Sequence, residues 1–249
     1  MRKEVLTIKL LYLVPGEMQQ EELFRRRDIL RECVFEGTQL DAWDCPGGPP
    51  SIESLTEEYQ SIPSTIERAV AAEKAGYDGI LLGCYADPGI DALREMLTIP
   101  VAGPFESSVG AALTMGYRFS IVTATPEMVP MLEEMVRSKG VASHRLSSVR
   151  AIDMDILSFG QQPELLLQRV SEESKRCLTH DRADCVILGC ISLAFSGADR
   201  EISHQLGVPC INPITTALKM AESFVSMGLS HSKKAFPLPH KLRSQKNVE

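Results

Sequence analysis

Short runs of apolar residues alternate with longer amphipathic segments along the chain. The apolar runs predict β-strands at residues 5–14, 77–84, 100–103, 119–123, 185–190 and 209–211. Because these runs are almost continuously apolar, they are typical of parallel strands buried on both faces. The segments between them predict helices at residues 62–75, 90–97, 126–139, 163–180, 200–206 and 215–227. The alternation indicates an α/β fold.

Two stretches of the chain, residues 75–108 and 181–216, resemble each other. Each contains an apolar run that ends in Leu-Gly-Cys, followed by a second short run between two prolines. The matching pairs are Asp78 and Asp184, Leu82 and Leu188, Gly83 and Gly189, Cys84 and Cys190, and, after a three-residue insertion, Pro100 and Pro209, and Pro104 and Pro213. An internal repeat of this kind predicts two halves of similar construction.

We therefore expect two pseudo-symmetric α/β lobes, each a mostly parallel sheet flanked by helices, with the active-site cleft between them. The first lobe is predicted at residues 1–104 and is completed by residues 216–249. The second is predicted at residues 105–215, and the helix after residue 215 should return to pack on the first lobe.

Cys84 and Cys190 each follow a glycine at the carboxyl end of a predicted strand, which is the sheet edge where ligands bind in open parallel sheets. Asp87 is predicted to cap the following helix, and Ser192 has a similar place after Cys190, so that backbone N–H groups and a helix dipole would lower the pKa of each thiol. A lone cysteine often only fills core space. Two at equivalent strand ends are expected to meet in one cleft and to act chemically.

Composition excludes several classes of function. A net charge of −7 argues against nucleic acid as the partner. No apolar stretch is long enough for a membrane span, and the opening residues predict a first strand instead of a signal peptide. Seven cysteines without regular spacing predict free thiols in a reducing cytoplasm. No zinc-site spacing or nucleotide-binding motif is present, so neither a metal nor a cofactor is expected. The basic segment at residues 230–249 is predicted to be a solvated, partly disordered terminus.

Four stretches resemble the aspartate/glutamate racemase superfamily and, within it, the hydantoin and allantoin racemase branch. They are LLGCYADPGIDALREMLTIPVAGPFESS, RFSIVTATPEM, CVILGCISLA and GGPPSIES, which together span most of residues 45–220. The resemblance implies a cofactor-independent enzyme with one catalytic cysteine from each lobe, Cys84 and Cys190, on opposite faces of the substrate. One thiolate can remove a proton while the opposite thiol returns one. The backbone N–H groups of Tyr85, Ala86, Ile191 and Ser192 are predicted to hold the charge that develops on the substrate.

Further contacts follow from the same resemblance. Residues 120–125 are similar to a substrate-contacting strand of the family, which makes Thr123, and after it Thr125, the predicted hydroxyl contact; a helix cap before Pro126 is the alternative for both. Residues 14–18 depart from the Asn-Pro-Asn-Thr type of loop usual in the branch. The arginines at residues 25–27 are predicted either to contact an anion or to form a solvated helix face.

The sequence thus predicts an isomerase that racemises or epimerises a 5-substituted hydantoin or an allantoin-like cyclic ureide. Amino-acid racemases of the superfamily commonly carry other residues directly after each cysteine, which favours the ring substrate. The alternatives are an Asp/Glu-type racemase, a decarboxylase or cis–trans isomerase of the same superfamily, or a small-molecule binding protein without activity. A small molecule is the expected partner, and a homo-oligomer is expected.

Overall fold

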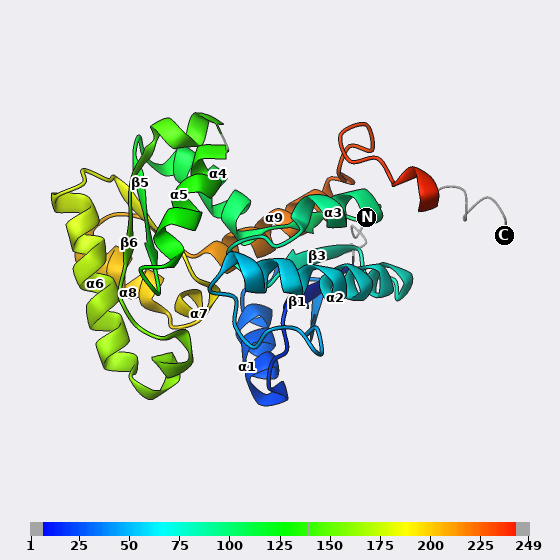
Figure 1. Cartoon of the computed structure of the whole chain (residues 1–249), viewed down its shortest axis with the longest axis horizontal. Coiled ribbons are helices and arrows are strands. Elements are labelled where there is room, and N and C mark those ends of the chain that lie inside the picture. Colours follow the sequence, from blue (N-terminus) through cyan, green and yellow to red (C-terminus); the bar gives the residue numbers. More distant parts are fainter. Residues whose placement is uncertain (1–6, 139, 243–249) are drawn as a thin grey trace, which may run out of the picture.

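Two parallel four-stranded sheets, one in each half of the chain, form the centre of the molecule (Figure 1). The computed structural model describes residues 7–138 and 140–242. The first sheet has the order β2-β1-β3-β4 and the second β6-β5-β7-β8, with every pair parallel. The strands are β1 (Ile8–Leu13), β2 (Thr38–Trp43), β3 (Gly79–Leu82), β4 (Val101–Ala102), β5 (Phe119–Thr123), β6 (Leu146–Ala151), β7 (Cys185–Leu188) and β8 (Cys210–Ile211). The predicted α/β class is confirmed.

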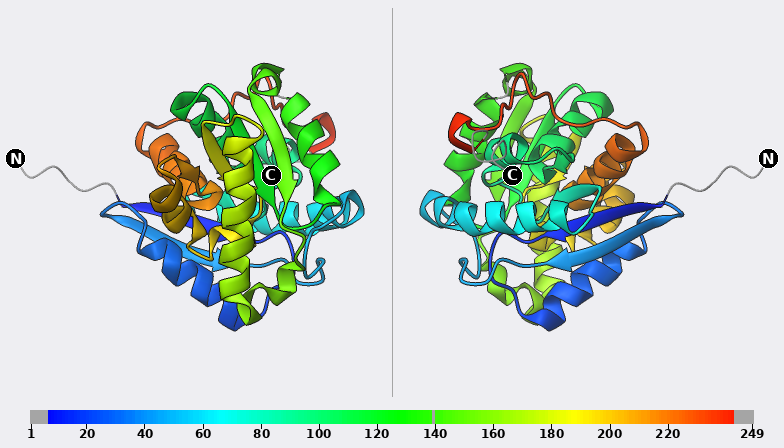
Figure 2. Two further views of the ribbon diagram at one scale, coloured as in Figure 1. Left: turned by 90° about the vertical axis from the view of Figure 1, so that its left-hand side faces the viewer. Right: turned by 90° about the vertical axis from the view of Figure 1, so that its right-hand side faces the viewer.

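Helices flank both sheets. They are α1 (Gln20–Arg31), α2 (Leu55–Lys74), α3 (Ile90–Met96), α4 (Pro104–Met115), α5 (Met128–Ser138), α6 (Pro163–Thr179), α7 (Ile191–Ala194), α8 (Ala198–Leu206) and α9 (Pro213–Ser226), with 3-10 turns η1 (Gly140–His144) and η2 (Ile156–Gln161). Helix α6 runs along β5, β6 and β7 of the second sheet (Figure 2).

Two helices cross between the halves. Helix α4 follows the first sheet but contacts β7 and β8, whereas α9 follows the second sheet but contacts β1, β3 and β4. The two helices also pack against each other, and Figure 1 shows α9 extending from one half toward the other. This exchange fixes the halves against each other. The lobe boundaries at residues 104 and 215 stay predictions.

The central strands have the burial that their sequences predict. Every residue of β3, β5 and β7 is buried, as expected for strands covered by helices on both faces. All six predicted strands and all six predicted helices are present among the described residues; positions 5, 6 and 139 of those predictions lie outside them.

Besides the four-residue helix α7 and the two 3-10 turns, four of the described elements were not predicted. Strands β2 and β6 lie at sheet edges and are only partly buried, so their sequences, TQLDAW and LSSVRA, lack a continuous apolar run. Helix α1 is rich in charge, and α4, PFESSVGAALTM, is buried and rich in small residues. None of these four sequences has the pattern on which the predictions depended.

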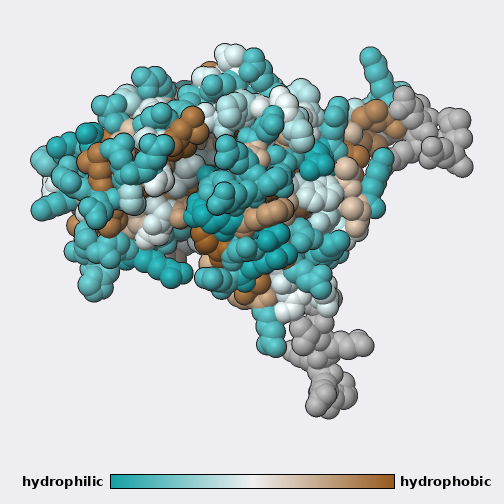
Figure 3. Space-filling view, turned by 90° about the horizontal axis from the view of Figure 1, so that it is seen from below, coloured by the Kyte–Doolittle hydropathy of each residue, from teal (hydrophilic) through white to brown (hydrophobic). Residues whose placement is uncertain are grey.

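The basic C-terminal segment also differs from the prediction. Within its described part, Lys233 donates hydrogen bonds to the carbonyl oxygens of Arg94, Glu95 and Leu97 at the end of α3, and His231 accepts one from the N–H of Val101. The segment is therefore bonded to the first half through His231 and Lys233, although residues 232–235 are exposed to solvent; residues 243–249 lie outside the described part. Elsewhere the face seen in Figure 3 is mostly hydrophilic, with hydrophobic residues in small separate patches. None of the described helices is long and apolar enough to cross a membrane.

Candidate active site

A cavity of about 1330 Å³ lies at the carboxyl ends of the strands and takes its walls from both halves. Its volume exceeds the ~300–1,000 Å³ of common ligand pockets. The predicted site residues that line it are Cys84, Tyr85, Ala86, Thr123, Cys190, Ile191 and Ser192. Thr125 is not among the lining residues; its carbonyl oxygen accepts a hydrogen bond from the N–H of Met128, at the start of α5. The fold thus brings together seven of the eight positions named from the sequence.

Each cysteine is held at its strand end by the glycine before it. The N–H of Gly83 donates to the carbonyl oxygen of Leu13 at 2.7 Å, and that of Gly189 donates to Val122 at 2.7 Å. A Cβ on Gly83 would lie 2.9 Å from the Tyr12 ring, and one on Gly189 would lie 2.4 Å from a methyl group of Ile121. The neighbouring strand is therefore too close for a side chain, which explains the glycine in both halves of the repeat.

The Cys84 thiol does not have the lowered pKa predicted from the sequence. Burial raises the pKa of Cys84 to about 12, and the backbone N–H of Ala86, which donates to the sulfur, offsets this only in part. Negative charges on Cys190, Asp87 and Glu58 raise the pKa further. Because a thiolate on Cys190 acts against one on Cys84, the pair disfavours the state in which both sulfurs are ionised.

Besides burial, the place of Asp87 differs from the prediction made for Cys84. Asp87 has a left-handed backbone with φ 52°, and α3 begins only at Ile90, with Gly89 as its N-cap. The Asp87 carboxylate instead accepts the N–H groups of Phe105 and Glu106 at 3.0 Å each, and so caps α4. Burial raises the pKa of this carboxyl to about 8, against these two donors. The turn after Cys84 thus places a carboxyl near the sulfur where a helix N-terminus was expected.

Cys190 has a different environment. It is itself the N-cap residue of the short helix α7, a place that the sequence assigned to Ser192. Burial raises the pKa of this thiol above its ordinary value as well, although the N–H groups of Leu193 and Ser192 and the charge of Arg26 offset part of the rise. The lowered pKa predicted from the sequence is therefore wrong for Cys190 too. The N–H groups of Ala86 and Ser192 are thus directed at the sulfurs, which leaves those of Tyr85 and Ile191 as candidates for holding a substrate oxygen.

Thr123 is fully buried, and its hydroxyl donates to the carbonyl oxygen of Gly189 at 3.2 Å. This contact supports the backbone directly before Cys190, and it differs from the helix cap that was the alternative prediction. Thr123 also lines the cavity, and its hydroxyl oxygen, which donates its proton to Gly189, keeps the capacity to accept a hydrogen bond.

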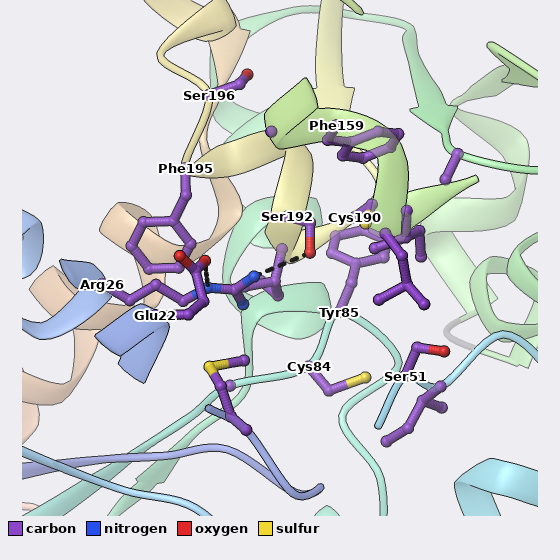
Figure 4. A pocket seen from close by; sticks show the side chains of 18 of the residues that line it. Glu22, Arg26, Ser51, Cys84, Tyr85, Phe159, Cys190, Ser192, Phe195 and Ser196 are labelled. Carbon is purple, nitrogen blue, oxygen red and sulfur yellow. Dashed lines mark hydrogen bonds and ion pairs between the residues drawn. The ribbon is translucent and has the colours of Figure 1, made fainter. Parts of the chain in front are cut away.

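One arginine of the run at residues 25–27 lines the cavity as a buried cation. Arg26 is 8% exposed; its Nε donates to Glu22 at 2.7 Å and its Nη2 to the Ser192 hydroxyl at 3.1 Å (Figure 4). Its guanidinium also lies 5.0 Å from the ring centroid of Phe195. Arg25 also lines the cavity but is half exposed and pairs with Glu22, and Arg27 pairs with Asp28 away from it. The predicted solvated face is thus wrong for Arg26, whereas Arg25 is half exposed and Arg27 is partly exposed.

The atypical loop at residues 14–18 forms part of the cavity wall. The N–H of Met18 donates to the Asp44 carboxylate at 3.1 Å, and that of Cys45 donates to the carbonyl oxygen of Gly16 at 3.0 Å. A Cβ on Gly16 would lie 2.2 Å from the carbonyl oxygen of Pro49, so this residue has no room for a side chain. The loop therefore packs against residues 44–50, of which Pro49 and Pro50 also line the cavity.

The cavity has one distinctly apolar side, which the sequence did not single out. It is formed by η2 and the start of α6, with Ile156, Leu157, Phe159, Leu166 and Leu167. In the part of the chain that the structure describes, no three His, Cys, Asp or Glu side chains gather into a set that could hold a metal ion.

Comparison with known proteins gives consistent matches. The family described as Asp/Glu/Hydantoin racemase matches residues 27–221. A hydantoin racemase from Pseudomonas sp. (strain NS671) is 38% identical over 205 residues, which is 82% of this chain and 81% of that protein.

Solved structures agree with these matches. An allantoin racemase from Klebsiella pneumoniae superposes with a TM-score of 0.87 at 27% identity, over 94% of each chain. A glutamate racemase from Francisella tularensis has a TM-score of 0.62 at 15% identity, over 91% of this chain and 84% of that one, which shows the shared fold alone.

Proposed function

The chain is a racemase of the Asp/Glu/hydantoin racemase family, and we propose that it interconverts the enantiomers of a 5-substituted hydantoin or an allantoin-like cyclic ureide. The resemblance noted from the sequence is thereby confirmed at the level of the family. The observation that supports the finer proposal most is the meeting of Cys84 and Cys190 in one cavity, each at the end of an equivalent strand (Figure 4).

The proposed reaction is a proton transfer through the substrate. The thiolate of one cysteine removes the proton from the ring carbon next to the carbonyl, and the electron pair of the broken C–H bond moves into the carbonyl to give an enolate. The thiol of the other cysteine then donates its proton to the opposite face of the same carbon and becomes the thiolate. Burial raises the pKa of both thiols, and a negative charge on one opposes a second on the other, so a thiolate on one cysteine leaves the other as the thiol that this reaction needs.

The surrounding groups suit a ring with alternating carbonyl and N–H groups. In the proposed complex, the N–H groups of Tyr85 and Ile191 donate to the carbonyl that becomes the enolate, since fixed donors aimed at developing charge stabilise it most. The lone pairs of Thr123 accept from a ring N–H. The apolar side around Phe159 receives the substituent on the reacting carbon, because it is the part of the wall with the fewest polar groups.

The alternatives of the same superfamily use a different bond change. An Asp/Glu-type racemase would bind a free amino group and carboxylates, a decarboxylase would release carbon dioxide, and a cis–trans isomerase would rotate a double bond. Two cysteines placed in one cavity fit inversion at a carbon better than either of the last two, which commonly lack or reassign one thiol.

The test measures the bond change directly. Purified enzyme should abolish the optical rotation of single enantiomers of 5-substituted hydantoins or allantoin, and in deuterium oxide it should place one deuteron on the reacting carbon as the product forms. Glutamate, aspartate and an arylmalonate serve as comparison substrates, with carbon dioxide release measured for the last. The proposal fails if no cyclic ureide in the panel exchanges its proton, and faster racemisation of a free amino acid would favour the alternative.

A further inference from the structure

Arg26 and Ser192 meet across the two halves, beside Cys190. Arg26 belongs to α1, and Ser192 belongs to α7, two residues after the cysteine. We propose that Arg26 is a positioning residue that makes Cys190, and not Cys84, the resting thiolate of the pair. This inference rests on the proposed function, because it assigns the starting roles in the proton transfer.

The arginine is fixed on every side that the structure describes. Its Nε is bound by Glu22, its Nη2 by the Ser192 hydroxyl, and its planar face lies against the Phe195 ring. A buried guanidinium needs such partners to offset its loss of hydration. Because it is held from three directions, Arg26 can keep the first turn of α7 in place, and the N–H groups of that turn are the donors to the Cys190 sulfur.

The charges around the two sulfurs differ in sign. Cys190 has the positive charge of Arg26 near it, with Glu53 as a weaker negative one. Around Cys84 the groups with the largest charge effects are Cys190, Asp87 and Glu58, none of which can carry a positive charge. Tyr12, which interacts with both Arg26 and Cys84, stays neutral because burial raises its pKa. A single negative charge shared by the two sulfurs is therefore more stable on Cys190.

The partner of Arg26 on its own helix does not cancel this effect. Glu22 is held ionised, with its pKa lowered to about 2 by Arg25 and Arg26, so Arg25 and Arg26 together leave one positive charge in excess over Glu22. Arg26 lies one residue before the stretch that the family description matches, which begins at residue 27. Arg26 belongs to the first half and places its positive charge near Cys190 of the second half. The repeat places no equivalent arginine among the charges that act most on Cys84.

The experiment reads the thiolates without any substrate. The full-length protein is alkylated with iodoacetamide at a series of pH values, and the labelled cysteines are identified by peptide mass spectrometry. We expect Cys190 to react about tenfold faster than Cys84 at pH 8. Removing the positive charge in Arg26→Met should raise the pKa of Cys190. A rise of about one unit lowers the thiolate fraction, and with it the labelling rate at Cys190, about tenfold. Arg26→Lys should restore most of that rate. Arg27→Met is the matched control and should label as the unaltered protein does.

Two further measurements separate position from charge and from folding. Ser192→Ala keeps the positive charge of Arg26 but removes its hydrogen bond to the Ser192 hydroxyl. We therefore expect the labelling rate at Cys190 to fall less than in Arg26→Met. Circular dichroism shows whether each variant is folded. In the racemisation assay, Arg26→Met should move the acid limb of the kcat/KM profile to higher pH for both enantiomers alike, since the limb reports the pair as a whole.

Faster labelling of Cys84 in the unaltered protein, or an unchanged Cys190 rate in folded Arg26→Met, would overturn the assignment. Failure of the proposed function would show differently: no racemisation of any cyclic ureide, whatever the labelling.

Discussion

At the end of β3, Gly83 donates its N–H to the neighbouring strand and Cys84 follows; at the end of β7, Gly189 makes the same bond at the same length and Cys190 follows. The backbone around the two sulfurs is thus nearly duplicated, whereas the charges are not. Asp87 and Glu58 lie near Cys84, and Arg26 lies near Cys190. The duplicated backbone places the two thiols at equivalent strand ends. The side chains around the thiols are not duplicated, and they give each thiol a different electrostatic environment.

The helix caps behind the two cysteines show the same kind of difference. In the first half, Asp87 in the turn after Cys84 reaches the N-terminus of α4. In the second half, Asn212 caps α9 from directly before the helix, and its amide donates back to the carbonyl oxygen of Ala194 at 2.9 Å. Gly103 has the place in the first half that Asn212 has in the second, and a Cβ on it would lie 2.3 Å from the Asp87 carboxylate. In both halves a side chain thus connects the turn after the cysteine with the start of a later helix. In the first half that side chain comes from the turn, and in the second half it comes from the helix cap.

The largest effect is expected from removing either thiol. Cys84→Ser and Cys190→Ser should each lower racemisation by roughly 10²–10⁴-fold, because a serine alkoxide is far harder to form than a thiolate near neutral pH. Each variant retains one thiol, so each should still exchange the proton of one enantiomer with solvent, and the two should prefer opposite enantiomers. Proton exchange followed by NMR in deuterium oxide, one enantiomer at a time, measures this.

Cys33→Ser is the control for that pair, since Cys33 is a partly exposed free thiol that does not line the cavity. It should retain the activity of the unaltered protein. Near-normal racemisation by folded Cys84→Ser or Cys190→Ser would remove that cysteine from the mechanism.

The sequence alone predicted the strands and the place of the two cysteines better than the side chains that surround the sulfurs. The repeated Leu-Gly-Cys ends are local patterns in continuously apolar strands, so the fold class and the meeting of the cysteines could be predicted. Arg26 stands in a run of three arginines, and its burial depends on contacts with Ser192 and Phe195, more than a hundred and sixty residues away. Asp87 was misassigned because capping was sought in the next helix, whereas the carboxylate bonds to α4. Long-range contacts of this kind leave no local pattern.

The two glycines before the cysteines offer a finer comparison. Gly83→Ala places a Cβ 3.0 Å from the carbonyl oxygen of Leu13, a backbone atom, whereas in Gly189→Ala the nearest atom is a side-chain methyl of Ile121. Overpacking of this kind costs about 1–3 kcal/mol of folding stability. We expect Gly83→Ala to lose more stability than Gly189→Ala, because a backbone carbonyl can move aside less easily than a side-chain methyl group. Urea unfolding measures the difference, and Gly110→Ala, where a Cβ would meet nothing within 4 Å, is the control. A larger loss for Gly189→Ala would contradict this explanation.

The exchanged helix caps predict a compensating pair of substitutions. Asp87→Ala leaves two N–H groups of α4 without their acceptor and should cost about 1–2 kcal/mol, the usual cost of a lost cap. Gly103→Asn should also destabilise, because its Cβ meets the Asp87 carboxylate. The double variant should recover part of the loss, since the introduced side-chain amide would cap α4 as Asn212 caps α9, once the end of the Ile90 side chain turns aside. Thermal unfolding of the unaltered protein, the two single variants and the double variant gives the coupling free energy between the two positions. If the two losses of stability simply add, the introduced asparagine does not replace the Asp87 cap.

The smallest effect concerns the outer edge of each sheet and depends on pH. The N–H of Val101 on β4 donates to Nε2 of His231 at 2.8 Å, whereas the N–H of Cys210 on β8 donates to the Ser203 hydroxyl at 2.9 Å. Only the first acceptor titrates. Burial and the nearby Arg94 lower the pKa of His231 below its ordinary 6.5, so the folded protein favours the neutral ring that can accept.

The sign of the effect follows from that lowered pKa. Above pH 6.5 the ring is neutral in both the folded and unfolded states, and the bond contributes fully. As the pH falls below 6.5 the unfolded chain binds a proton first, so stability falls until the folded ring is protonated too. We expect a loss of ~1 kcal/mol, the net contribution of one hydrogen bond. His231→Gln keeps an acceptor that does not titrate and should reduce the loss between pH 8 and pH 5, whereas Ser203→Ala should cost the same at both. Equal losses on acidification in the unaltered protein and in His231→Gln would show that the edge of the first sheet is no more sensitive to pH than that of the second.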